Sequence, residues 1–220
     1  MPKVSDEYFE KKREEIIDAA YKVALTKSIS SITLKDVRDE VGMARGGMYR
    51  YYNNLDEILA DLINKVNREN SFKNDVKDIL DKKKTDTCEP TTILKNLCRM
   101  LAKNMTSADS EVLLLSLEFD VFCIHEPERI LKISEHLKDN DENSGMFLYF
   151  SLIDYIKSET KKGNMKPVMP VNDLVEYFMT VIKGILLQYS LTRKLQSEEY
   201  NTDSMYKALY KTMLSLLGCK

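Results

Sequence analysis

Apolar residues recur every three or four positions along most of the chain, which is the repeat of an amphipathic helix. Such stripes predict helices at about 6–27, 33–41, 44–52, 54–66, 94–105, 112–124, 130–137, 146–156, 172–189 and 205–216. The 220 residues include only 7 Gly and 5 Pro, so few positions interrupt these helices. The pattern therefore favours an all-α fold over a turn-rich β fold.

Several predicted helices have recognisable ends. Thr33 with Asp36 three residues later is typical of a capping box, and Gly42 is a typical C-terminal stop. Asn54 and Asn172 are expected to cap the helices that follow them. Two short helices would thus flank a turn led by Gly42, which makes the segment a helix-turn-helix candidate.

Residues 67–90 are polar and charged and contain a run of three lysines, Lys82 to Lys84. This change in composition predicts a boundary between two helical domains, at 8–68 and 69–220. The lysine run has two interpretations, a nucleic-acid patch or a solvated helix end, and we favour the second.

The overall charge gives no sign of nucleic-acid binding, because 33 basic residues nearly balance 35 acidic ones. Any DNA-binding surface must therefore be local. Residues 33–52 contain four basic and three acidic residues, a net charge of +1. So small a positive charge predicts modest DNA affinity for one domain, which favours two DNA-binding domains acting on one operator.

The residues of the candidate motif resemble the DNA-binding domain of the TetR (tetracycline-repressor) family. The matching strings are Ile17-Asp18-Ala19-Ala20, then Ile32-Thr33-Leu34-Lys35-Asp36-Val37, then the segment from Gly42 to Tyr52. Their order and spacing follow the family pattern over about residues 10–60. The resemblance implies a dimeric transcription regulator in which a C-terminal helical body dimerises and binds a small effector.

Within the motif, Met48 and Tyr52 lie four residues apart and are expected to pack inward. From the resemblance and the spacing together, we expect the following residues to face the DNA: Thr33, Lys35, Ala44, Arg45, Gly46, Gly47, Tyr49, Arg50 and Tyr51. Arg45 suits a guanine edge in the major groove, and Tyr49 suits a phosphate as in the family. Thr33 and Lys35 lie at the positive end of a helix, where a phosphate can bind. Arg50 is equally compatible with a solvated surface position.

Three positions depart from the family pattern. Ala44 replaces the usual capping Ser, Gly47 the usual Thr, and Leu55 a usual Lys that contacts phosphate in relatives. Adjacent glycines inside a short helix are unfavourable, since each costs about 1 kcal/mol relative to Ala. We expect Gly46 and Gly47 to allow close approach of the backbone to the DNA; the alternative is that one of them relieves crowding inside the domain.

The second domain offers two candidate surfaces. An effector pocket, mostly apolar, is expected from Met100, Met105, Glu118, Phe119, Phe122, Phe147, Phe150 and Tyr177, although such residues are more often plain core. Glu118 and Asp120 interrupt the apolar stretch 112–124, which reads as a buried helix, and are either paired core residues or pocket-lining groups. A dimer interface is expected from Val175, Phe178, Ile182, Ile185 and Tyr189, packed with Leu209 and Met213 of the last helix. The alternative for that 3, 4 spacing is an ordinary core face.

The chain shows no catalytic constellation, and we expect no enzyme activity, no cofactor and no metal. His125 and His136 lack the spacing of a helical metal pair, and Cys88, Cys98, Cys123 and Cys219 form no C-x-x-C motif. No apolar signal segment opens the sequence, and residues 112–124 are too short to span a bilayer, so a cytoplasmic protein is expected. The leading hypothesis is an effector-responsive repressor that binds a palindromic operator as a homodimer. The alternative is an all-helical interaction protein that does not bind DNA.

Overall fold

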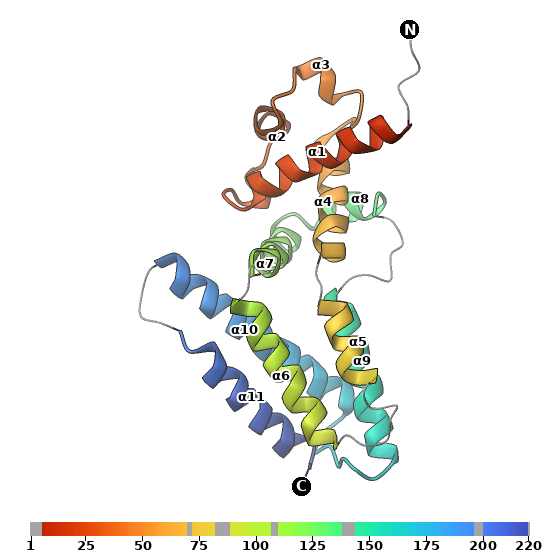
Figure 1. Cartoon of the computed structure of the whole chain (residues 1–220), viewed down its shortest axis with the longest axis vertical. Coiled ribbons are helices and arrows are strands. Elements are labelled where there is room, and N and C mark those ends of the chain that lie inside the picture. The colour runs from red at the N-terminus through yellow and green to blue at the C-terminus, as the bar shows by residue number, and fades with distance from the viewer. Residues whose placement is uncertain are drawn as a thin grey trace. The chain divides into compact units, whose positions relative to one another are not determined.

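The computed structural model describes residues 6–69, 72–81, 89–106, 110–137, 144–195 and 200–219, which form helices and no strands (Figure 1). The helices are α1 (Asp6–Ala24), a 3-10 turn η1 (Ile29–Ser31), α2 (Leu34–Val41), α3 (Arg45–Met48), α4 (Leu55–Glu69), α5 (Phe72–Asp81), α6 (Pro90–Thr106), α7 (Ser110–His125), α8 (Pro127–Ser134), α9 (Ser144–Lys161), α10 (Val171–Leu195) and α11 (Thr202–Leu216). The predicted all-α class is confirmed. The lysine run Lys82 to Lys84 lies outside the described residues.

Most of the predicted helix ends are confirmed. Gly42 ends its helix with φ of 71°, and the Asn54 side chain accepts a hydrogen bond from the Glu57 N–H at 2.9 Å. The cap at Asn172 is wrong: α10 already begins at Val171, and the Leu174 N–H donates to the Pro170 carbonyl at 3.1 Å. Proline's fixed φ suits it to the entry of a helix, so the first turn forms one or two residues earlier than the Asn signal indicates.

Contacts divide the chain into two compact units, Met1–Glu69 with Leu115–Asn140, and Asn70–Leu114 with Asp141–Lys220. In the first unit, α1 packs on α2 and α4, and α8 packs on α4. Its core includes the fully buried Ile16, Ala20, Val37, Ile58 and Leu62. These units are not the two continuous ranges 8–68 and 69–220 proposed from composition, because the segment 115–140 groups with the first unit.

In the second unit, α6 packs on α11 and α5, while α9 packs on α10 and α5. The predicted stripe Leu94, Leu97, Leu101 and Met105 is buried along α6. At the end of α11, the Lys166 N–H donates to the Leu217 carbonyl at 2.8 Å. The backbone of the loop that follows α9 is thereby tied to the last residues of the unit.

Two helices are more exposed than an apolar sequence suggests. On α7, Val121 and Ile124 are 47% and 75% exposed, so the expectation that this helix is buried all round is wrong. The helix buries only one stripe, which includes Leu115 and Phe122. By length and composition α10 could cross a membrane, and 28% of its most apolar window is buried; a single such helix is weak evidence for a span, because core helices of soluble proteins share these properties.

Candidate nucleic-acid interface

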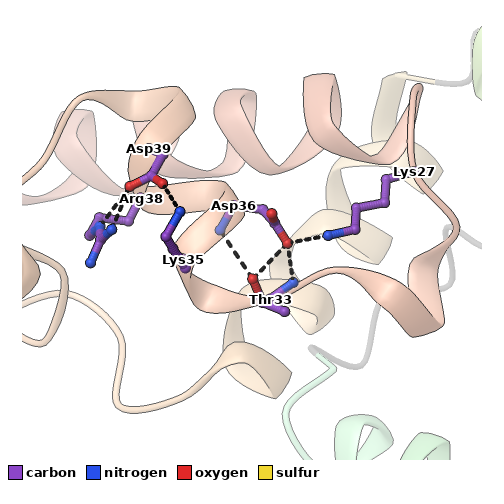
Figure 2. Close-up of polar contacts among 6 residues, drawn as sticks. All are labelled: Lys27, Thr33, Lys35, Asp36, Arg38 and Asp39. Carbon is purple, nitrogen blue, oxygen red and sulfur yellow. Dashed lines mark hydrogen bonds and ion pairs between the residues drawn. The ribbon is translucent and has the colours of Figure 1, made fainter.

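The start of α2 is fixed by a reciprocal capping box (Figure 2). The Thr33 hydroxyl oxygen accepts from the Asp36 N–H at 3.2 Å, and the Thr33 N–H donates to Asp36 Oδ2 at 2.8 Å. The same carboxylate oxygen also accepts from the Thr33 hydroxyl at 2.6 Å and from Lys27 Nζ at 2.7 Å. The Lys27 ammonium, and then the Thr33 donors, lower the pKa of Asp36 to about 2.

This arrangement changes the expected role of Thr33. Both of its donors already serve Asp36, whose negative charge lies at the positive end of α2. A phosphate approaching there would meet a carboxylate rather than open N–H groups. The structure therefore gives no support to a direct phosphate contact by Thr33.

Gly42 allows the chain to turn from α2 into α3. Its left-handed conformation (φ 71°) closes α2 with a hydrogen bond from its own N–H to the Arg38 carbonyl. Ala44 then precedes α3 and makes no side-chain capping bond, as its lack of a hydroxyl implies. The predicted helix at 44–52 is too long: α3 spans Arg45–Met48, and residues 49–51 form turns. An uncapped start and two glycines both disfavour a longer helix.

Burial separates the inner and outer faces of this segment as predicted. Met48 and Tyr52 are each 1% exposed, and Val37 of α2 is fully buried. The side chains of Arg45, Tyr49 and Arg50, together with Gly46, are exposed, and Gly47 is half-buried.

The two glycines of α3 are not required by the fold. A Cβ added at Gly46 or Gly47 would have no heavy atom within 4 Å, apart from chain neighbours and the helix's own backbone. Neither residue has the positive φ that favours glycine. The alternative that one of them relieves crowding is therefore not supported within the described chain.

Tyr51 is held by the scaffold rather than directed outward. It is half-buried, and its ring lies 4.9 Å from the Phe9 ring of α1, centroid to centroid. The expectation that Tyr51 faces DNA overlooked this pairing, because Phe9 lies in a charged stretch with no clear apolar stripe. Part of the Tyr51 side chain is therefore covered by α1.

Sequence reasoning also missed a polar cluster that anchors Tyr52, the last residue of the helix-turn-helix segment, to α1 and α4. Arg13 of α1 pairs with Asp61 of α4 at 2.6 Å, and the Tyr52 hydroxyl donates to the same Asp61 oxygen at 2.9 Å. The Arg13 guanidinium lies 4.4 Å from the centre of the Tyr52 ring. Burial, and then the Asp61 carboxylate, raise the pKa of the Tyr52 hydroxyl, which keeps it a donor. The sequence offered one signal for this cluster: Tyr52 was expected in the core, and a buried tyrosine hydroxyl requires a hydrogen-bond partner.

Cations of α2 and α3 share a groove of about 290 Å³ lined by Leu34, Lys35, Arg38, Arg45, Met48 and Tyr49. Lys35 and Arg38 are each paired with Asp39. Among the residues that the structure describes, the side chains of Arg45, Arg50 and Tyr49 have no hydrogen-bond or ion-pair partner. The groove edge thus offers an unpaired guanidinium and an unpaired hydroxyl to a ligand.

The residues expected to line an effector pocket are divided between the two units. Glu118, Phe119 and Phe122 belong to the first unit; Met100, Met105, Phe147, Phe150 and Tyr177 belong to the second. Met100, Met105 and Phe122 are buried, whereas Phe150 and Tyr177 are 54% and 46% exposed. Phe147 is covered by Lys73 and Lys77 of α5, whose Nζ atoms lie 5.4 and 5.5 Å from the ring centre. Glu118 is half-buried and Asp120 is exposed, so neither is an enclosed core carboxylate.

The residues expected at a dimer interface mostly serve the core of a single chain. Val175, Phe178, Ile185, Leu209 and Met213 are buried, while Ile182 and Tyr189 are half-buried. The exposed apolar side chains of α10 are instead Tyr177, Leu187, Leu191 and Leu195. The buried residues of this seam therefore fit the alternative interpretation, an ordinary core face.

Comparison with known proteins finds a family match for the segment that contains α2 and α3. Residues 16–62 match the family described as bacterial regulatory proteins, tetR family. A Bacillus subtilis (strain 168) protein named as the uncharacterized HTH-type transcriptional regulator YfiR is 39% identical over 62 residues, which are 28% of this chain and 30% of that protein. The match therefore spans less than a third of that relative's length.

Solved structures are similar over nearly the whole chain, although their sequences are distant. A TetR-family transcriptional regulator from Cytophaga hutchinsonii superimposes with a TM-score of 0.68 and 14% identity, covering 99% of this chain and 100% of that one. Salmonella enterica GusR gives a TM-score of 0.66 and 13% identity, covering 98% and 99%. At such identities the likeness concerns the fold.

Proposed function

We propose that this chain, whose residues 16–62 match the TetR family of bacterial regulatory proteins, regulates transcription by binding duplex DNA with α2 and α3. One observation carries the proposal: in α3 and the turn that follows it, Met48 and Tyr52 are buried, while the side chains of Arg45, Tyr49 and Arg50 are exposed and unpaired among the described residues. This is the division of faces that a recognition helix needs to enter a major groove.

The exposed residues have separate roles in this proposal. Arg45 reads a base edge, for which guanine offers two acceptors to a guanidinium. Tyr49 and Arg50 contact phosphates and set the position of α3 on the duplex. Lys35 supplies a further phosphate contact from α2, while Thr33 acts indirectly, by holding the first turn of α2 in place.

We place the dimer interface on the exposed face of α10. Tyr177, Gly184, Leu187, Leu191 and Leu195 fall within one side of that helix, and an exposed apolar stripe of this kind is typical of a surface that binds another chain. A two-fold arrangement pairs the stripe with itself and gives two heads for a palindromic operator. Val175, Phe178 and Ile185 then support the interface from behind.

An effector site in the second unit and repression relieved by the effector complete the proposal, with the protein acting in the cytoplasm and without catalysis. The effector must bind the form with low DNA affinity more tightly than the other form, because otherwise it shifts no equilibrium. Met100 and Met105 are the predicted pocket residues whose burial suits an apolar ligand. An all-helical interaction protein without DNA binding is the competing function.

The test is a DNA-binding titration with duplexes from the promoter beside the gene and with random duplexes. The full chain should shift a promoter duplex in a gel, and Arg45→Ala should weaken that binding by about 1–3 kcal/mol with a smaller loss on random DNA. Arg99→Ala, an exposed arginine of α6, is the matched control and should bind as the unmodified chain does. Failure to bind any duplex would favour the interaction protein, and equal losses on both duplexes would assign Arg45 to the backbone.

A further inference from the structure

Asp39 holds two cations of α2 at once (Figure 2). Lys35 Nζ lies 2.7 Å from Asp39 Oδ2, and Arg38 approaches the other oxygen, Oδ1, with Nε at 2.9 Å. Each carboxylate oxygen therefore has its own cation. These hydrogen bonds, that of Lys35 before that of Arg38, lower the pKa of Asp39 below its ordinary value.

The two cations held in this way also line the groove between α2 and α3. Lys35 and Arg38 form part of its wall together with Arg45, which has no partner of its own among the described residues. A phosphate in the groove would seek the same ammonium and the same guanidinium edge that Asp39 now occupies, since carboxylate and phosphate oxygens bind these groups alike. Two of the three groove cations are thus already engaged before DNA arrives.

We propose that Asp39 is an internal competitor for the DNA backbone: it holds Lys35 and Arg38 in the free protein, and a phosphate entering the groove displaces it. The inference rests on the proposed DNA-binding function and names a determinant of its strength. The Asp39 side chain is 47% exposed, and exposed ion pairs are weak, so the competition tunes affinity without preventing binding.

A simpler effect must be separated from this one. Any carboxylate on a DNA-binding head repels the phosphate backbone, so its removal strengthens binding whatever its neighbours. Glu40 is the matched control: it is the next residue of α2, and within the described part of the chain its carboxylate makes only a long contact of 3.9 Å with Lys22. Asp39→Asn and Glu40→Gln therefore change the charge equally, and only the first releases Lys35 and Arg38.

The experiment measures the affinity of the full chain for a fluorescent random-sequence duplex by anisotropy, at one fixed salt concentration because affinity depends steeply on salt. Asp39→Asn should tighten binding about two- to fivefold more than Glu40→Gln does. Asp39→Ala introduces a good helix former and should give the same gain in affinity. This second variant shows that the gain does not come from a loss of helical structure in α2.

The same two carboxylate substitutions, made in a chain that lacks both cations, test whether Asp39 acts through Lys35 and Arg38. In a chain carrying Lys35→Met and Arg38→Met, Asp39→Asn should tighten binding no more than Glu40→Gln. Equal gains from the two carboxylate changes in the unmodified background would overturn the inference, as would an Asp39 gain that survives without the two cations. If the unmodified chain binds no duplex at any salt concentration, the proposed function itself fails.

Discussion

Arg13 and Asp61 join α1 to α4 through an ion pair of 2.6 Å, and the Tyr52 hydroxyl donates to the same carboxylate oxygen. The end of the recognition segment is therefore tied to both scaffold helices by one carboxylate. The Arg13 side chain is 30% exposed and that of Asp61 14%, so the pair is only partly screened by water. We regard Tyr52 as a positioning residue that fixes where α3 leaves the scaffold.

Tyr52→Phe removes one hydrogen bond from this cluster and keeps the ring in the core. It should lower the free energy of unfolding by about 1 kcal/mol, the usual net value of such a bond. Urea denaturation followed by circular dichroism measures the change. Tyr49→Phe is the control: its exposed hydroxyl has no partner among the described residues, so stability should stay the same while promoter affinity falls. Equal stability of the two variants would contradict the role given to Tyr52.

Asp36→Asn should destabilise the chain at neutral pH but not near pH 2. The pKa of Asp36 is about 2 in the folded chain against an ordinary 3.8, so folding favours the ionised carboxylate. Its contribution is complete above about pH 5, where the carboxyl of the unfolded chain is also ionised, and it is lost as the pH falls through about 2. Thermal melts across this range should show the unmodified chain losing its advantage over Asp36→Asn. A stability difference between the two chains that persists unchanged down to pH 2 would contradict this role of Asp36.

Gly47→Ala separates folding from recognition. A Cβ at this position has no neighbour within 4 Å beyond its own helix and adjacent residues, so the change should raise stability by up to about 1 kcal/mol through helix propensity. If the bare backbone approaches the floor of the major groove, the same methyl group should weaken promoter binding. A higher melting temperature with unchanged affinity would show that Gly47 makes no close contact with DNA.

The matched glycine control lies at the other end of the chain. Gly218 has φ of 61°, and a Cβ there would lie 2.5 Å from the Lys166 carbonyl oxygen. Gly218→Ala should therefore lower the melting temperature, in contrast to Gly47→Ala. A rise for both variants would mean that the added methyl groups act on the unfolded chain alone.

Leu191→Asp places a charge in the middle of the exposed stripe of α10. Because a charge buried at an interface without a partner is strongly unfavourable, the variant should sediment as a monomer and lose promoter affinity. Leu131→Asp, at a 67% exposed position of α8, is the control and should keep the mass of the unmodified chain. A Leu191→Asp chain that remains dimeric would exclude this face as the interface.

Local signals in the sequence were sufficient for the helix-turn-helix. The pairing of Thr33 with Asp36, the left-handed Gly42 and the inward Met48 and Tyr52 all follow from interactions within a few residues. For the same reason, the helical class and the stripe on α6 were predictable from spacing alone.

Long-range contacts decided the features that sequence reasoning missed. Arg13 meets Asp61 across 48 positions, and Phe9 takes up the face of Tyr51, so neither contact leaves a periodic trace. On α10 the spacing marked one apolar face, as either a dimer interface or an ordinary core face, and the packing of α10 on α9 and α11 was needed to choose between them. The capping box was foreseen, but not that it occupies the donors of Thr33.

The ion pair between Asp56 of α4 and Arg129 of α8, at 2.8 Å, has a consequence for modular exchange of DNA specificity. A chimera that joins residues 1–69 of this chain to the body of another regulator would leave α8 behind. Asp56 would then lack its guanidinium partner, and the face of α4 on which α8 packs would meet a foreign surface. A DNA-binding domain transferred to another regulator should therefore carry the 115–140 segment with it. Alternatively, the recipient protein should supply an arginine from its corresponding helix at this point.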